Sequence, residues 1–188
     1  MSAIVLADPA SIVNYSLAKI GYRLRIGSLY DGTIASKKAL DVYSQTRDVM
    51  LRLGDWNFAM KTAAAIASGG SVPAPWTNSW TYPADCLRVR NVYDTGSVAD
   101  TNNPLPTLWQ EADDPTKGKV IYTRAANATI VYNAQITDPS QWESLFLDAF
   151  ALALGRNLRS LVDGDANMTK LSDEEISAET RLANEVVG

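Results

Sequence analysis

The sequence predicts an α+β fold in which a helical bundle, built from both ends of the chain, carries a small antiparallel β insertion. Apolar residues recur at steps of three and four in both end regions, the period of an amphipathic helix. Glycine and proline gather between residues 68 and 83, and short strand-like runs follow up to residue 136. With 188 residues, 46% of them hydrophobic, the chain has enough apolar material for one core. We therefore expect a single domain over residues 1–188.

Two helices are expected before the insertion. The first covers about residues 8–20, because Asp8 can cap it and Pro9 fits the first helical position. The second covers about residues 33–53 and ends at Gly54. Its apolar stripe is one of the two longest in the chain, so we expect this helix to pack in the centre of the bundle.

The β insertion is expected over about residues 60–136. Its strand candidates, separated by turn residues, are Leu87 to Tyr93, Leu108 to Gln110, Val120 to Thr123 and Thr129 to Ile136.

Two further helices are expected after the insertion. The third covers about residues 139–161 and is apolar nearly all round, so it should pack against the second helix. Asp138 can cap it, with Gln141 completing a capping box. The last helix is expected over about residues 173–187.

Composition removes many catalytic classes. The chain has no histidine, so Ser/His/Asp and Cys/His nucleophile systems and His-ligated metals are excluded. Cys86 is the single cysteine, which excludes an internal disulfide and a multi-cysteine zinc site. Because Asp85 precedes it, we do not expect a reactive thiol. The net charge of −4 argues against a protein that coats DNA. We expect no signal peptide, no membrane span, no metal and no cofactor.

Three patterns leave other chemistry open. One acidic stretch has carboxylate and amide residues at the spacing of a calcium-binding loop. Met168 stands where such a loop needs a glycine for its sharp turn, so we interpret the stretch as a helix-to-helix turn. A carbohydrate hydrolase could use paired carboxylates of the β region, and aromatic rings near two arginines could stack bases or sugars. The residues at calcium-loop spacing are Asp163, Asp165, Asn167 and Glu174. The carboxylates are Glu111, Asp113, Asp114 and Asp138. The rings are Trp76, Trp80, Tyr82 and Tyr93, and the nearby arginines are Arg88 and Arg90.

An ordered series of short strings carries a resemblance to a known family. The strings are Ile26 to Asp31, Trp56-Asn57-Phe58-Ala59, Tyr82-Pro83-Ala84-Asp85-Cys86-Leu87 and Thr137-Asp138-Pro139-Ser140-Gln141-Trp142. In this order the chain resembles the head-to-tail connector, or tail adaptor, proteins of tailed bacteriophages, the tail tubular protein A type among them. The resemblance covers about residues 10–187. We expect the signature residues to be structural, with Trp56 and Phe58 buried and Pro83 stiffening the entry to a strand.

The resemblance implies a virion structural protein and not an enzyme. It implies a twelve-fold ring at the neck of the virion between the portal protein and the tail or next connector protein. Double-stranded DNA would pass through the lumen without sequence-specific binding, and assembly would occur in the host cytoplasm. We expect the last helix to contact the portal through its apolar residues Leu171, Ile176, Leu182, Val186 and Val187. The alternatives are a tail-associated carbohydrate hydrolase and a non-enzymatic binding module.

Overall fold

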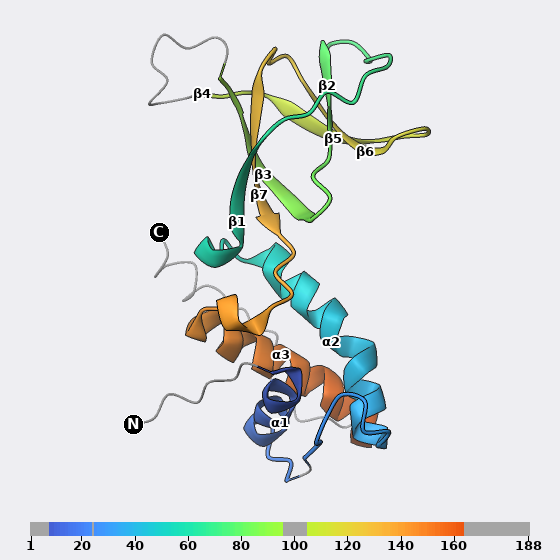
Figure 1. The fold of residues 1–188 in the computed structure, drawn as a ribbon, viewed down its shortest axis with the longest axis vertical. Helices are drawn as coiled ribbons and strands as arrows, with labels where there is room; N and C mark the ends of the chain where they lie inside the picture. The colour runs from blue at the N-terminus through green and yellow to red at the C-terminus, as the bar shows by residue number, and fades with distance from the viewer. Residues whose placement is uncertain (1–7, 24, 96–104, 164–188) are drawn as a thin grey trace. The chain divides into compact units, whose positions relative to one another are not determined.

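The computed structural model describes residues 8–23, 25–95 and 105–163. Contacts divide the chain into two compact units, Met1–Ala59 with Ile136–Gly188 and Met60–Gln135. We call them the helical unit and the sheet unit (Figure 1). A division into contact-rich units does not decide how many domains fold, so the single domain over residues 1–188 stays a prediction.

The helical unit contains α1 (Pro9–Lys19), α2 (Ile34–Leu53) and α3 (Ser144–Asp163), with α3 packed against both other helices. The Asp8 side chain caps α1 by accepting from the backbone N–H of Ala10, and Thr33 caps α2 by accepting from that of Ser36. These bounds lie within one residue of the expected first and second helices. The expected packing of the second helix on the third is confirmed.

The third helix begins later than expected. Asp138 caps a separate 3-10 turn, η2 (Pro139–Gln141), by accepting from the backbone N–H of Ser140. Trp142 is then extended, and its indole N–H donates to the Ile136 carbonyl at 3.1 Å. Because this bond and the burial of the ring fix an extended residue after the turn, α3 starts only at Ser144.

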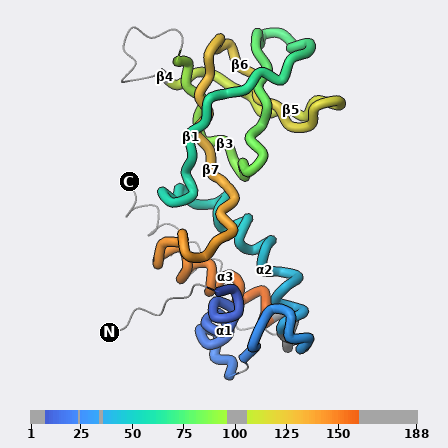
Figure 2. Tube along the Cα trace, viewed as in Figure 1, coloured from blue at the N-terminus to red at the C-terminus, as the bar shows by residue number. Residues whose placement is uncertain are grey.

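The sheet unit contains seven strands among its described residues. They are β1 (Met60–Ala64), β2 (Asn78–Thr81), β3 (Cys86–Asp94), β4 (Leu105–Pro106), β5 (Trp109–Asp114), β6 (Gly118–Thr123) and β7 (Ala128–Ala134). They form a four-stranded sheet in the order β1-β7-β3-β4 and a three-stranded sheet in the order β2-β6-β5, with antiparallel pairing throughout. Figure 2 follows β1 and β7 side by side.

The expectation of a helical bundle with a small β insertion is wrong. Two antiparallel sheets make this a sheet-rich α+β fold. The sequence analysis predicted too few strands, because β1 and β2 lack the alternating apolar residues that indicate a strand. Both strands exist through pairing with distant partners, β1 with β7 and β2 with β6.

Candidate functional site

An aromatic cluster fills the centre of the helical unit. The Phe146 ring is at its middle, with its centroid 5.0 Å from that of Trp56, 5.1 Å from that of Phe58 and 5.1 Å from that of Trp142. Trp56 and Phe146 are completely buried, whereas Phe58, which we expected to be buried, is half-buried. The structure therefore brings together three predicted signature residues, Trp56, Phe58 and Trp142, in a packed core.

The chain reaches this cluster through a tight turn after α2. The Trp56 indole N–H donates to the Met50 carbonyl at 2.9 Å, which satisfies both a buried donor and an acceptor at the helix end. A Cβ on Gly54 would lie only 2.4 Å from the Trp56 Nε1, so the indole packs where a side chain would otherwise stand. Asn57, the second residue of this signature string, is exposed and opens the 3-10 turn η1 (Asn57–Ala59).

Asp85 is the centre of a polar clamp in the sheet unit. Its carboxylate receives the Lys61 ammonium at 2.7 Å and the Tyr132 hydroxyl at 3.0 Å, while its carbonyl accepts from the Gln135 N–H. Hydrogen bonding from Lys61 lowers the pKa of Asp85, whereas burial and Asp85 raise the pKa of Tyr132 to about 12. The clamp thus ties the segment before β3 to β1 and β7.

Pro83 and Cys86 form the turn beside this clamp. The Pro83 carbonyl accepts from the Cys86 N–H at 3.0 Å. Burial raises the pKa of the Cys86 thiol to about 11, so the thiolate is scarce at neutral pH. Pro83, Asp85 and Cys86 therefore act together as a strand entry, and the geometry gives the thiol no activation.

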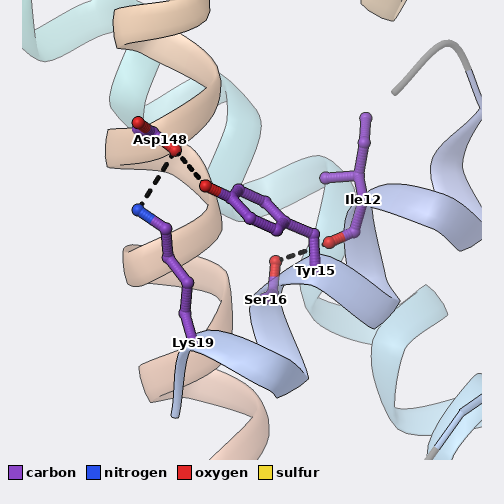
Figure 3. Close-up of polar contacts among 5 residues, drawn as sticks. All are labelled: Ile12, Tyr15, Ser16, Lys19 and Asp148. Atoms are coloured by element: carbon purple, nitrogen blue, oxygen red, sulfur yellow. Dashed lines mark hydrogen bonds and ion pairs between the residues drawn. The ribbon is translucent and has the colours of Figure 1, made fainter. Parts of the chain in front are cut away.

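A second polar group, which the sequence analysis missed, links α1 to α3 (Figure 3). The Asp148 carboxylate accepts from the Tyr15 hydroxyl at 2.5 Å and pairs with the Lys19 ammonium at 3.1 Å. Hydrogen bonding to Asp148 raises the pKa of Tyr15. Burial opposes the lowered pKa of Asp148, but the bonds from Tyr15 and Lys19 outweigh it. These directions keep Tyr15 protonated and Asp148 ionised, the states that hold the two helices together.

The loop before α2 is organised by Asp31. Its carboxylate accepts from the backbone N–H groups of Gly27 at 2.9 Å and Thr33 at 3.0 Å. Hydrogen bonding from the Ser36 side chain, and then from Thr33, lowers the pKa of Asp31. Tyr30 at the loop tip is 80% exposed. A hollow of about 130 Å³ lies beside the loop, well below the roughly 300 to 1,000 Å³ of small-molecule sites. Its lining is Asp8, Pro9, Ala10, Gly27, Ser28, Leu29 and Tyr30.

The carboxylates considered for a hydrolase are divided between the two units, and two of them, Glu111 and Asp113, line a common hollow of about 100 Å³. Glu111, Asp113 and Asp114 lie along β5, whereas Asp138 caps a turn in the helical unit. Thr116 hydrogen bonds lower the pKa of Asp114, and the Ser140 N–H lowers that of Asp138. A general acid for glycoside cleavage needs a raised pKa, so these two groups are shifted in the opposite direction.

The aromatic rings considered for stacking serve the sheets. Trp80 is 8% exposed on β2, and the Trp76 indole N–H donates to the Gln110 side chain at 3.1 Å. Arg90 donates to the side chain of the fully buried Asn133 at 3.1 Å. Trp80 is therefore buried, and Trp76 and Arg90 are held by hydrogen bonds, so these three residues do not form an open stacking platform.

The remaining predicted residues fall at or beyond the end of the described chain. Asp163 is the last residue of α3, and Asp165, Asn167 and Glu174 lie outside the described residues. The expected last helix at 173–187 lies outside them too, with all five portal-contact candidates, Leu171, Ile176, Leu182, Val186 and Val187.

Comparisons with known proteins yield no match, neither to a family model nor to a curated protein. Within residues 8–23, 25–95 and 105–163, no group of three or more Cys, Asp or Glu side chains is arranged to hold a metal ion. None of the helices in this part of the chain has the length and apolar character needed to cross a membrane.

Proposed function

We propose that this protein is a structural subunit of a phage virion, a head-to-tail connector that forms a ring between portal and tail. The observation that supports this function most is the structural position of the residues that carry the resemblance. Trp56, Phe58 and Trp142 meet in one aromatic core, and Asp85 ties three parts of the sheet unit together. Residues that build the fold in this way are those that a family of assembly proteins would share.

Exposed apolar side chains give the proposed subunit surfaces for assembly. Val49 and Leu53 are 49% and 55% exposed and stand one turn apart on α2, so they share a face of the helix. Large exposed apolar groups that cluster are typical of protein contact sites. A ring needs complementary patches on two flanks of one subunit, because its contacts are heterologous. We assign the α2 face to one of these flanks.

The proposed partners follow the resemblance. The subunit contacts the portal protein, the tail or next connector protein, and further copies of itself in a ring of twelve. Double-stranded DNA passes through the lumen, and the net charge of −4 favours passage over adhesion. The proposed location is the neck of the virion, after assembly in the host cytoplasm.

The proposed portal contact uses the apolar residues beyond α3, Leu171, Ile176, Leu182, Val186 and Val187. They would act as anchors in a groove of the portal, with affinity gained only in the assembled particle. Deleting Ser172 to Gly188 should leave a folded protein by circular dichroism and abolish incorporation into particles. Loss of the folded signal would mean that the segment belongs to the core, and normal incorporation would place the portal contact elsewhere.

The deciding experiment is electron microscopy of the purified protein mixed with portal assemblies. We expect a monomer or weak oligomer alone and a ring on the portal. The double variant Val49→Lys with Leu53→Lys should reduce ring formation, whereas Leu108→Lys, at a residue 78% exposed in the sheet unit, should not. Protein that stays off a saturating amount of portal at physiological salt would argue against the connector function.

A further inference from the structure

In the described part of the sheet unit, one outer strand lacks the protection of the others. The outer strands of its two sheets are β1 and β4, and β2 and β5. Natural proteins protect such edges with proline, charge, short length or a covering segment, because unpaired backbone groups invite another strand. Comparing the four strands identifies the edge that is open.

Three of these edges are blocked. β4 has two residues, and one of them is Pro106, which has no N–H to donate. The edge of β2 is covered by its own chain, because the Thr81 N–H donates to the Ile66 carbonyl at 2.7 Å and the Ser68 N–H donates to the Ser79 carbonyl at 2.9 Å. β5 carries Glu111, Asp113 and Asp114 within six residues.

Among the described residues, β1 has none of these protections. Four of its five residues are exposed, and its single charge, on Lys61, is compensated by Asp85. The Ala65 N–H donates to the Ala128 carbonyl in the register of the β1 and β7 pair, so odd-numbered residues bond to β7. Backbone groups alternate in direction, so those of Met60, Thr62 and Ala64 point to the outer edge. No strand in the described chain pairs there (Figures 1 and 2).

We propose that this edge binds β1 of a second copy of the chain, antiparallel and centred on Thr62. In that register Thr62 lies opposite its own symmetry mate and Met60 lies opposite Ala64 of the second copy. Lys61 lies opposite an alanine, Ala63, so no like charges face each other. The same operation on β5 would place Glu111 directly opposite Asp113, a repulsive pair. Charge therefore permits the symmetric pairing at β1 and opposes it at β5.

The pairing goes beyond the proposed ring and does not rest on it. A two-fold contact is isologous, whereas a closed ring uses heterologous contacts, so β1 serves a different association from the α2 face. A five-residue strand buries far less than the ~1,200 Å² of a stable interface, so the dimer forms weakly and depends on protein concentration.

Sedimentation of the purified full-length chain tests the association without any portal present. The mass should rise from monomer to dimer with concentration. Thr62→Pro removes an outward N–H at a position where an edge strand tolerates proline, and Thr62→Lys adds facing charges, so both should stay monomeric with an unchanged circular dichroism spectrum. Ala126→Lys, at an exposed bend between β6 and β7, is the matched control and should dimerise like the parent protein. A parent protein that remains monomeric at every concentration would overturn the proposal.

Cysteine cross-linking tests the register. Opposed residues of a hydrogen-bonded antiparallel pair have Cα atoms ~5.5 Å apart, within disulfide range. Under mild oxidation, Thr62→Cys should form a covalent dimer at least about tenfold faster than Met60→Cys or Ala126→Cys, because pairing raises the effective thiol concentration only at the two-fold centre. All three variants keep the native Cys86, so its contribution is the same. Equal rates at positions 62 and 60, or at 62 and 126, would overturn the register and with it the β1 pairing.

Discussion

The two units of this protein use their signature residues in physically different ways. In the helical unit Trp56 and Phe146 are fully buried, and their rings pack against each other with centroids 5.0 Å apart. In the sheet unit Asp85 holds Lys61 in an ion pair whose side chains are 39% and 48% exposed. Buried rings contribute several kcal/mol, whereas exposed ion pairs contribute ~1 kcal/mol or less. Residues singled out by the same sequence analysis therefore do not contribute equally to the free energy of unfolding.

The largest effect is expected from Trp56→Ala. Removing a buried indole leaves a cavity beside Phe146 and leaves the Met50 carbonyl with only the longer bond from the Gly54 N–H at 3.4 Å, so the free energy of unfolding should fall by ~3 to 5 kcal/mol. Urea denaturation followed by circular dichroism measures it. Leu108→Ala, at a residue 78% exposed, is the control and should change stability little. A loss below ~1 kcal/mol for Trp56→Ala would mean that the aromatic core does not dominate the helical unit.

Glycine substitutions come next, because two glycines allow close approach in the helical unit. A Cβ on Gly155 would lie 2.8 Å from the Ser16 carbonyl oxygen of α1, and one on Gly54 would lie 2.4 Å from the Trp56 indole. Gly155→Ala and Gly54→Ala should each cost ~1 to 3 kcal/mol through overpacking. Gly27→Ala is the matched control, since its nearest atom is 4.0 Å away. Thermal melts that shift equally for all three would contradict this account.

These positions show which parts of the molecule could be read from the sequence. Helix bounds at α1 and α2 were predictable because caps and stops are local: Asp8, Thr33 and Gly54 act within a few residues of themselves. The burial of Trp56 was predictable because a large ring follows directly after an amphipathic helix.

The remainder depends on partners far along the chain. Tyr15 meets Asp148 across 133 residues, and no local pattern encodes such a pair. β1 has no apolar alternation and exists through its register with β7. Gly155 gave a readable signal, because glycine inside a helix often marks a close approach, but only the structure identifies Ser16 as the neighbour.

The polar clamp predicts a pH dependence of modest size. Because the pKa of Asp85 is lowered in the folded protein, its contribution is fully present above the unfolded pKa of ~3.9 and is lost as the pH falls through the folded pKa. Asp85→Asn should therefore destabilise by up to ~1 kcal/mol at pH 7, discounted for exposure of the pair, and by less below pH ~4. Urea titrations at both pH values measure the difference. A deficit that grows on acidification would show that the sign is wrong.

The smallest effect is expected from Tyr43→Phe in the aromatic cluster. This substitution distinguishes the contribution of ring packing from that of hydrogen bonding. Tyr43 is 5% exposed and its ring packs edge-on against Phe150 at 5.2 Å, but its hydroxyl has no hydrogen-bond partner among the described residues. Burial without a partner raises the pKa of this hydroxyl and makes it unfavourable in the core. Tyr43→Phe keeps the ring contact and removes the unpaired group, so stability should be unchanged or higher by a few tenths of a kcal/mol.

Tyr15→Phe is the matched comparison, because it removes the bond to Asp148 and should cost ~0.5 to 1.5 kcal/mol. If Tyr43→Phe destabilises the protein as much as Tyr15→Phe does, the Tyr43 hydroxyl has a partner, and the helical core is more polar than its ring packing implies.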